Sequence, residues 1–93
     1  LTPEVATEVR FDLDESADAT IVEVFARDRP GLLHAITAAL ADAGLDIALS
    51  KITTEGEKVA DVFYVSAGGE KLVEPDALAA VARAITDALG GLD

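Results

Sequence analysis

The chain has 93 residues, half of them apolar, and is therefore predicted to form one domain with a core, spanning residues 1–93. Its formal net charge of −11 repels nucleic acid and anionic membrane surfaces, so neither is an expected partner. It contains no cysteine and a single histidine, His34. Disulfides, thiolate chemistry and the usual zinc sites are thereby excluded, and no metal or cofactor is expected.

The first elements are predicted to be two strands. Apolar and polar residues alternate over Val5–Leu13, which is typical of a strand with one solvent-exposed face. The polar loop Asp14–Asp18 follows. The β-branched run Thr20–Arg27 then predicts a second strand.

A helix is predicted over Pro30–Ala43, because apolar residues recur there at helical spacing. Gly44 is placed to end it in the left-handed conformation. The predicted buried stripe of this helix is Leu33, Ile36, Leu40 and Ala43.

The second half repeats the order of two strands and a helix. Asp46–Thr54 and Lys58–Ser66 are predicted strands joined by a tight turn at Glu55–Gly56, and Gly68–Gly69 reads as a further turn. The last helix is predicted from Pro75 to Gly90. Its core face consists of Leu78, Val81, Ile85 and Leu89.

The order ββαββα indicates an α+β fold, with a four-stranded antiparallel sheet and two helices on one face. The strands at 20–27 and 58–66 are expected in the centre, with Val5–Leu13 on the outer edge of the former. Strand Val59–Val65 is largely apolar on both faces. Because the helices cover only one face, a second subunit or a tandem domain is expected on the other.

The turn Arg27–Leu33 joins a strand directly to a helix and is the best candidate for a binding site. The first backbone N–H groups of a helix lack partners within it, and together with the helix dipole they favour a carboxylate or phosphate. Pro30 sets φ for a helix start, and Gly31 leaves room for close approach. A well-formed helix start without a ligand explains the same residues.

Charged residues in this turn each have two interpretations. Asp28 is an acceptor for a ligand ammonium or a general base, or it is the N-cap of the helix, and both roles can hold together. Arg27 and Arg29 either hold an anion or are solvated. His34 is interpreted as a surface or interface residue.

No arrangement typical of catalysis is visible, since no nucleophile lies beside a base and no glycine-rich phosphate loop is present. Asp61, in an apolar strand, is interpreted as the ion-pair partner of Lys51 or Lys58 across the hairpin. No apolar stretch reaches 18 residues, and Leu1–Glu4 does not resemble a signal peptide, so a cytoplasmic location is expected. The first residue is not Met, which favours a fragment of a longer chain.

The order of elements and the motif Arg29-Pro-Gly-Leu-Leu33 resemble the ACT domain, a small regulatory module of amino-acid metabolism. The resemblance runs from Thr20 to Leu89 and defines an ACT core at 20–89, with 1–19 as an extra N-terminal edge strand and loop. The usual ACT order is βαββαβ, so this chain resembles a permuted ferredoxin-like ACT fold. Further segments resemble the C-terminal ACT modules of the glutamine-sensing protein-PII uridylyltransferases: Ile36–Asp42, Gly44–Ile47, Lys51–Thr54, Gly56–Glu57 and Asp61–Val65.

The resemblance implies an amino acid, possibly glutamine, bound between two modules of a homodimer or tandem pair. Asp28 takes the place of a polar residue, often Asn, that contacts the ligand head group. Asp46 and Ile47 match a strand that faces the site from the partner module. The implied ligand-binding residues are Asp28, Arg29, Pro30, Gly31, Leu32, Leu33, Asp46 and Ile47.

The leading hypothesis is a regulatory amino-acid-binding ACT domain, a glutamine-sensing module of a uridylyltransferase that has no catalytic activity of its own. The alternative is a dimerisation or docking module of the same fold that binds no ligand. A small ferredoxin-like enzyme of the acylphosphatase type is least favoured. Such an enzyme needs an Asn to orient water, and this sequence contains none.

Overall fold

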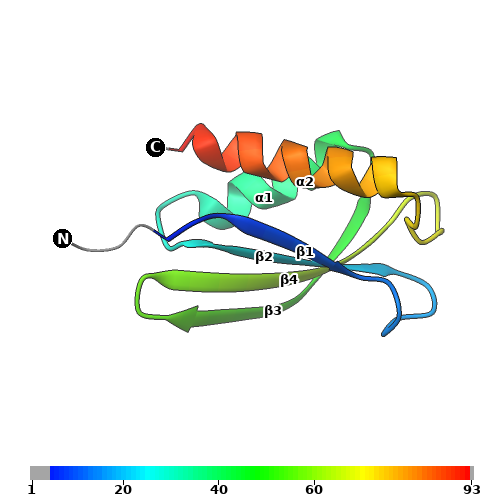
Figure 1. Ribbon diagram of the computed structural model, residues 1–93, viewed down its shortest axis with the longest axis horizontal. Coiled ribbons are helices and arrows are strands. Elements are labelled where there is room, and N and C mark those ends of the chain that lie inside the picture. Colours follow the sequence, from blue (N-terminus) through cyan, green and yellow to red (C-terminus); the bar gives the residue numbers. More distant parts are fainter. Residues whose placement is uncertain (1–4, 93) are drawn as a thin grey trace.

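The computed structural model describes residues 5–92 and confirms the predicted ββαββα order. Both helices lie on the same face of the sheet (Figure 1). Leu1–Glu4, on which the signal-peptide interpretation rests, falls outside the described residues. The elements are β1 Glu8–Asp12, β2 Thr20–Arg27, α1 Leu32–Asp42, β3 Asp46–Glu55, β4 Lys58–Ser66 and α2 Pro75–Gly90.

The four strands form an antiparallel sheet in the order β1-β2-β4-β3. The central position of β2 and β4, and the place of β1 on the outer edge of β2, are confirmed. β1 is shorter than predicted because its pairing with β2 begins at Glu8, opposite Phe25. Val9 and Phe11 of β1 are partly buried against the core, as their alternation predicts.

An irregularity in β3 decides which of its residues face the helices. Leu49 pairs with Phe63, but the register then shifts, and Ile52 pairs with Asp61. Paired residues share one face of a sheet, so the extra residue turns Ile52 toward the helix side in place of Lys51. This shift brings the second half of β3 to the candidate site.

The buried stripe of α1 differs from the prediction. Leu32, Ile36 and Leu40 are buried, whereas Leu33 is 38% exposed and Ala43 is also exposed. The helix begins at Leu32, two residues after Pro30, because Gly31 has a φ of 83° that no α-helix accommodates. Leu32 and Leu33 are both apolar, so periodicity alone could not choose between them.

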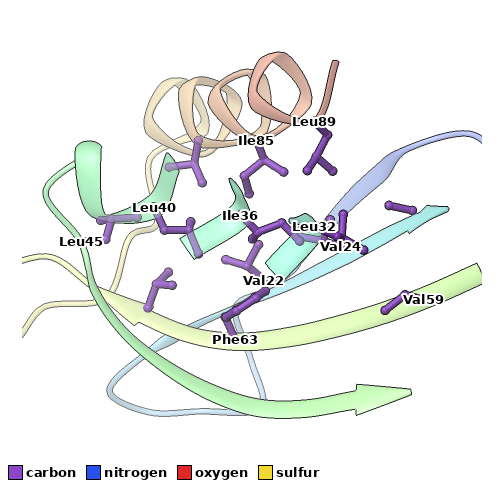
Figure 2. Close-up of a cluster of buried hydrophobic side chains, with 13 residues drawn as sticks. Val22, Val24, Leu32, Ile36, Leu40, Leu45, Val59, Phe63, Ile85 and Leu89 are labelled. Atoms are coloured by element: carbon purple, nitrogen blue, oxygen red, sulfur yellow. The ribbon is translucent and has the colours of Figure 1, made fainter. Parts of the chain in front are cut away.

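The two helices pack together over the centre of the sheet. Figure 2 shows Ile36 of α1 between Ile85 of α2 and two side chains of the sheet, Val22 and Phe63. Along α2, Val81 and Leu89 join Ile85 in the core as predicted, and Leu78 is partly buried.

Gly44 ends α1 as predicted. Its φ is 81°, its N–H donates to the carbonyl of Ala41 at 2.9 Å, and the N–H of Leu45 donates to that of Leu40 at 3.2 Å. This pair of bonds is a Schellman motif, which satisfies carbonyls that the helix end would leave unpaired. Leu45 is thereby turned back into the core.

The sheet face opposite the helices carries apolar side chains from both central strands, as predicted. Ile21 is buried there between neighbouring side chains, and Tyr64, its cross-strand neighbour, is 40% exposed. Arg10 and Lys58 lie over the ring of Phe25, at 4.9 and 5.5 Å from its centroid. What covers this face stays a prediction. None of the described helices is long and apolar enough to cross a membrane.

Candidate functional site

A pocket of about 510 Å³ lies at the end of the molecule where β2 passes into α1. Three parts of the chain form its walls: the RPG loop (residues 28–31), the first turn of α1, and the ends of β3 and β4 next to their hairpin turn. We call it the loop pocket. Its lining residues are Asp28, Arg29, Gly31, Leu32, Leu33, His34, Ile52, Thr54, Val59 and Asp61.

The RPG loop is held by its backbone rather than by side-chain capping. The N–H of Asp28 donates to the carbonyl of Glu57 at 2.6 Å, which ties the loop to the β3–β4 turn. The N–H of Leu32 donates to the carbonyl of Arg29 at 3.2 Å, closing a turn just before the helix. Gly31 supplies the positive φ at the N-cap, which is the physical reason for a glycine here.

Asp28 is not the N-cap of α1. The N-cap is Gly31, and no side chain among the described residues caps this helix end. Asp28 lies three positions too early in the chain, because the helix starts later than the sequence suggested. Its carboxylate is exposed and lines the loop pocket, where it is available to a ligand.

The guanidinium of Arg29 connects the RPG loop to the other helix. One terminal nitrogen donates to the carbonyl of Leu89 at 2.7 Å, and the other donates to the carbonyl of Arg27 at 3.3 Å. A cation at the C-terminal end of α2 also matches the negative end of the helix dipole. The guanidinium therefore has a structural function in the fold, whichever of the predicted roles it also serves.

The buried wall of the loop pocket carries a carboxylate. Asp61 is only 2% exposed, and among the described residues its Oδ1 has no hydrogen-bond partner. Its predicted ion pair with Lys51 or Lys58 is wrong. Asp61 alternates in phase with buried Val59 and therefore faces the helix side.

The environment of Asp61 disfavours its charged form. Burial raises the pKa of Asp61 above its ordinary value, and the nearby negative charge of Asp28 raises it further. Buried polar atoms in folded proteins almost always have partners, so an unpartnered carboxylate oxygen beside a cavity marks a place for a donor. The pocket thus combines a helix N-terminus, an exposed carboxylate and a buried carboxylate.

Five of the eight predicted ligand-binding residues line the loop pocket; Pro30, Asp46 and Ile47 do not. Pro30 is exposed just before α1. Asp46 and Ile47 begin β3, at the opposite end of that strand from Ile52. Their contribution from a partner module stays a prediction.

Sequence reasoning missed the contribution of β3 and β4. The signal for Asp61 was its phase with Val59 and Val65, which places all three side chains on one face. Nothing in the sequence revealed the β3 register shift that turns Ile52 and Thr54 toward the pocket. His34 is exposed, as predicted, and lines the same pocket.

Comparison with known proteins agrees with this fold. The family model of the ACT domain matches residues 20–86. The chain belongs to the ACT domain family. The match begins at β2, so β1 of this ACT domain precedes the region that the family model describes. No solved structure matches the chain significantly.

Several relatives of this ACT domain are enzymes named bifunctional uridylyltransferase/uridylyl-removing enzyme. The protein from Caulobacter vibrioides is 51% identical over 61 residues, which is 66% of this chain and 6% of the relative. The one from Bordetella pertussis is 41% identical over 87 residues, or 94% of this chain and 10% of the relative. The one from Azospirillum brasilense is 42% identical over 86 residues, 91% of this chain and 9% of the relative. The chain therefore spans a tenth or less of these relatives.

Among the described residues, no group of three or more His, Asp or Glu side chains is placed to hold a metal ion. The loop pocket also contains no serine or cysteine beside a base. The lining offers backbone N–H groups at a helix start, the exposed carboxylate of Asp28, the buried carboxylate of Asp61 and several apolar side chains.

Proposed function

We propose that this ACT domain is a regulatory module that binds a free amino acid in the loop pocket. The observation that carries the proposal is the buried carboxylate of Asp61, whose Oδ1 lacks a partner within residues 5–92 and lines a cavity that opens at a helix N-terminus. A carboxylate that remains desolvated without a donor costs stability, so binding gives a reason for it to be there.

The charges of the pocket match those of an amino-acid head group. The N–H of Leu32 is already bonded to the carbonyl of Arg29, but the next N–H groups of α1 lack carbonyl partners inside the helix. Together with the positive end of the helix dipole, they favour the ligand carboxylate. The carboxylate of Asp28, in the RPG loop preceding this helix, lines the same pocket and is the proposed partner of the ligand ammonium. A zwitterion therefore satisfies both sides at once.

The open side of the pocket suits closure by a neighbouring module. Leu49 and Ile52 of β3 face the helix side but are 48% and 49% exposed. A second ACT module, from a homodimer or a tandem pair, would cover such apolar surface and contribute Asp46 and Ile47 from its own β3. The names of the relatives support a uridylyltransferase as the parent chain. Glutamine is the first amino acid to test because the sequence resembles glutamine-sensing ACT modules.

A thermal-shift screen of the purified domain against the twenty amino acids tests the proposal. A compound that binds only the folded state stabilises it by about 2.7 kcal/mol at a hundredfold excess over its Kd. We expect one amino acid, glutamine first, to raise the Tm at millimolar concentration. If none of the twenty shifts the Tm, the domain is not an amino-acid sensor by itself.

The alternative is a dimerisation or docking module that binds no ligand, and the apolar sheet face around Tyr64 favours it. Sedimentation velocity separates the two, because a module of this kind self-associates at micromolar concentration without any amino acid. A sensor that uses a neighbouring module instead associates more tightly when its amino acid is present.

A further inference from the structure

We propose that Asp61 is the specificity-determining residue of the loop pocket: it accepts a hydrogen bond from an N–H group on the side chain of the bound amino acid and excludes side chains that end in a carboxylate. The inference rests on the proposed function, since it concerns the amino acid held in that same pocket. It adds the residue that selects the side chain of that amino acid.

The first step is that the Oδ1 atom of Asp61 has no hydrogen-bond partner among residues 5–92. Its cross-strand neighbours are Val24 on β2 and Ile52 on β3, and neither side chain can donate a hydrogen bond. Its Oδ1 is buried and unpartnered among the described residues. The loop pocket, which Asp61 lines, is the route by which a donor can reach this oxygen.

The second step is depth. Asp28 is exposed at the rim of the loop pocket, beside the N-terminus of α1, whereas Asp61 is 2% exposed in its wall. The head group of an amino acid is held at the rim, where Asp28 and the N–H groups lie. Its side chain then extends inward to Asp61.

The third step is charge. An ionised carboxylate accepts hydrogen bonds but cannot donate them. Burial raises the pKa of Asp61, and the nearby charge of Asp28 raises it further, so a third carboxylate in this space meets repulsion from both. The guanidinium of Arg29 donates to the neutral backbone carbonyls of Leu89 and Arg27 and keeps its positive charge. It offsets one of the two negative charges, so the lining still carries a net negative charge. His34, the remaining titratable residue of the lining, is exposed at the rim.

These three steps divide the amino acids into classes. A side-chain amide or ammonium group donates N–H to Asp61 and completes its hydrogen bonding. An apolar side chain leaves the carboxylate desolvated and unpaired, and a side-chain carboxylate adds repulsion. The expected ligand therefore has a side chain that ends in an N–H donor, as in glutamine or asparagine.

The test is isothermal titration with L-glutamine and L-glutamate as probes, on the wild type, Asp61→Asn and Asp18→Asn. Asp18→Asn is the matched control, because it makes the same charge change at an exposed position in the β1–β2 loop. We expect the wild type and the control to bind glutamine about 100-fold more tightly than glutamate. Asp61→Asn should bind glutamine about 10- to 100-fold more weakly and lose most of this preference, because its amide can donate to a carboxylate.

Three results would overturn the inference. If Asp61→Asn keeps the glutamine-to-glutamate ratio of the wild type, Asp61 does not select the side chain, although the proposed function stands. A wild type that binds leucine more tightly than glutamine leads to the same conclusion. If none of the twenty amino acids binds the wild type, the proposed function fails and the inference fails with it. Circular dichroism checks the fold of Asp61→Asn, and Asp61→Leu replaces it in the titration if it does not fold.

Discussion

Replacing Asp61 with leucine is expected to stabilise the unliganded domain while removing its ability to hold an N–H donor. The two side chains are similar in shape. The neighbours across both strands, Val24 and Ile52, are apolar, so a leucine fits the chemistry of its surroundings. The substitution removes a buried carboxylate whose Oδ1 has no partner among the described residues.

The size of the effect follows from the cost of an unsatisfied buried polar group, which is about 1–3 kcal/mol. For a domain of this length, each kcal/mol moves the Tm by about 4–8 °C. Asp61→Leu should therefore raise the Tm at pH 7 by about 4 °C or more. Asp18→Leu, the same replacement at an exposed acid, should leave it nearly unchanged.

The stability gained by Asp61→Leu should also depend on pH, and the direction of this dependence can be worked out. The pKa of Asp61 is raised by burial and by Asp28 above its ordinary value of 3.8. Between 3.8 and its folded value the native state binds more protons than the unfolded state, so wild-type stability falls as pH rises through this window. Above this window, the wild type has lost all of the stability that protonation of Asp61 contributes at low pH. The advantage of Asp61→Leu should thus be smaller at pH 3.5 than at pH 7.

Urea unfolding of wild type and Asp61→Leu at several pH values between 3.5 and 7 measures this difference directly. A leucine variant that is less stable than the wild type at pH 7 would refute the reasoning, because Asp61 would then have a partner that stabilises it. A difference that does not change with pH would show that the carboxylate titrates normally.

The remaining predictions concern the RPG loop and the site that it forms. Asp28→Ala should weaken amino-acid binding by about 1.5–3 kcal/mol in titration calorimetry. It should not lower the unliganded Tm, since Asp28 caps no helix and its charge disfavours ionised Asp61; a lower Tm would contradict this. Gly31→Ala should cost about 1–2 kcal/mol in urea unfolding, because alanine is strained at a φ of 83°. Arg29→Ala should cost about 1.5–3 kcal/mol by losing its bond to Leu89, and an unchanged midpoint would contradict this.

The order of elements and the sheet were predictable because they depend on local patterns. Alternation along β1 and the apolar runs of β2 and β4 each predict a strand without any knowledge of distant contacts. Gly44 predicted the end of α1, since a left-handed residue there satisfies the last carbonyls. These signals lie within a few residues of the features that they determine.

The candidate site was predictable only in part, because it joins segments far apart in the sequence. The RPG loop was recognisable from its own residues. The role of Asp61 was predicted wrongly. An ion pair across the hairpin was assumed, although the alternation of side chains along the strand places Asp61 on the buried face. The start of α1 was predicted too early. Proline is common at a helix start, and the positive φ of Gly31 depends on the three-dimensional structure around it rather than on the local sequence.

The bond from Arg29 to the carbonyl of Leu89 gives the pocket a mechanical connection to a distant part of the chain. Arg29 and Leu89 are 60 positions apart, and the bond between them is 2.7 Å long. While it holds, the loop beside the pocket and the final turn of α2 cannot shift independently. Any rearrangement that an amino acid imposes on this loop must therefore either pull on the last turn of α2 or release it.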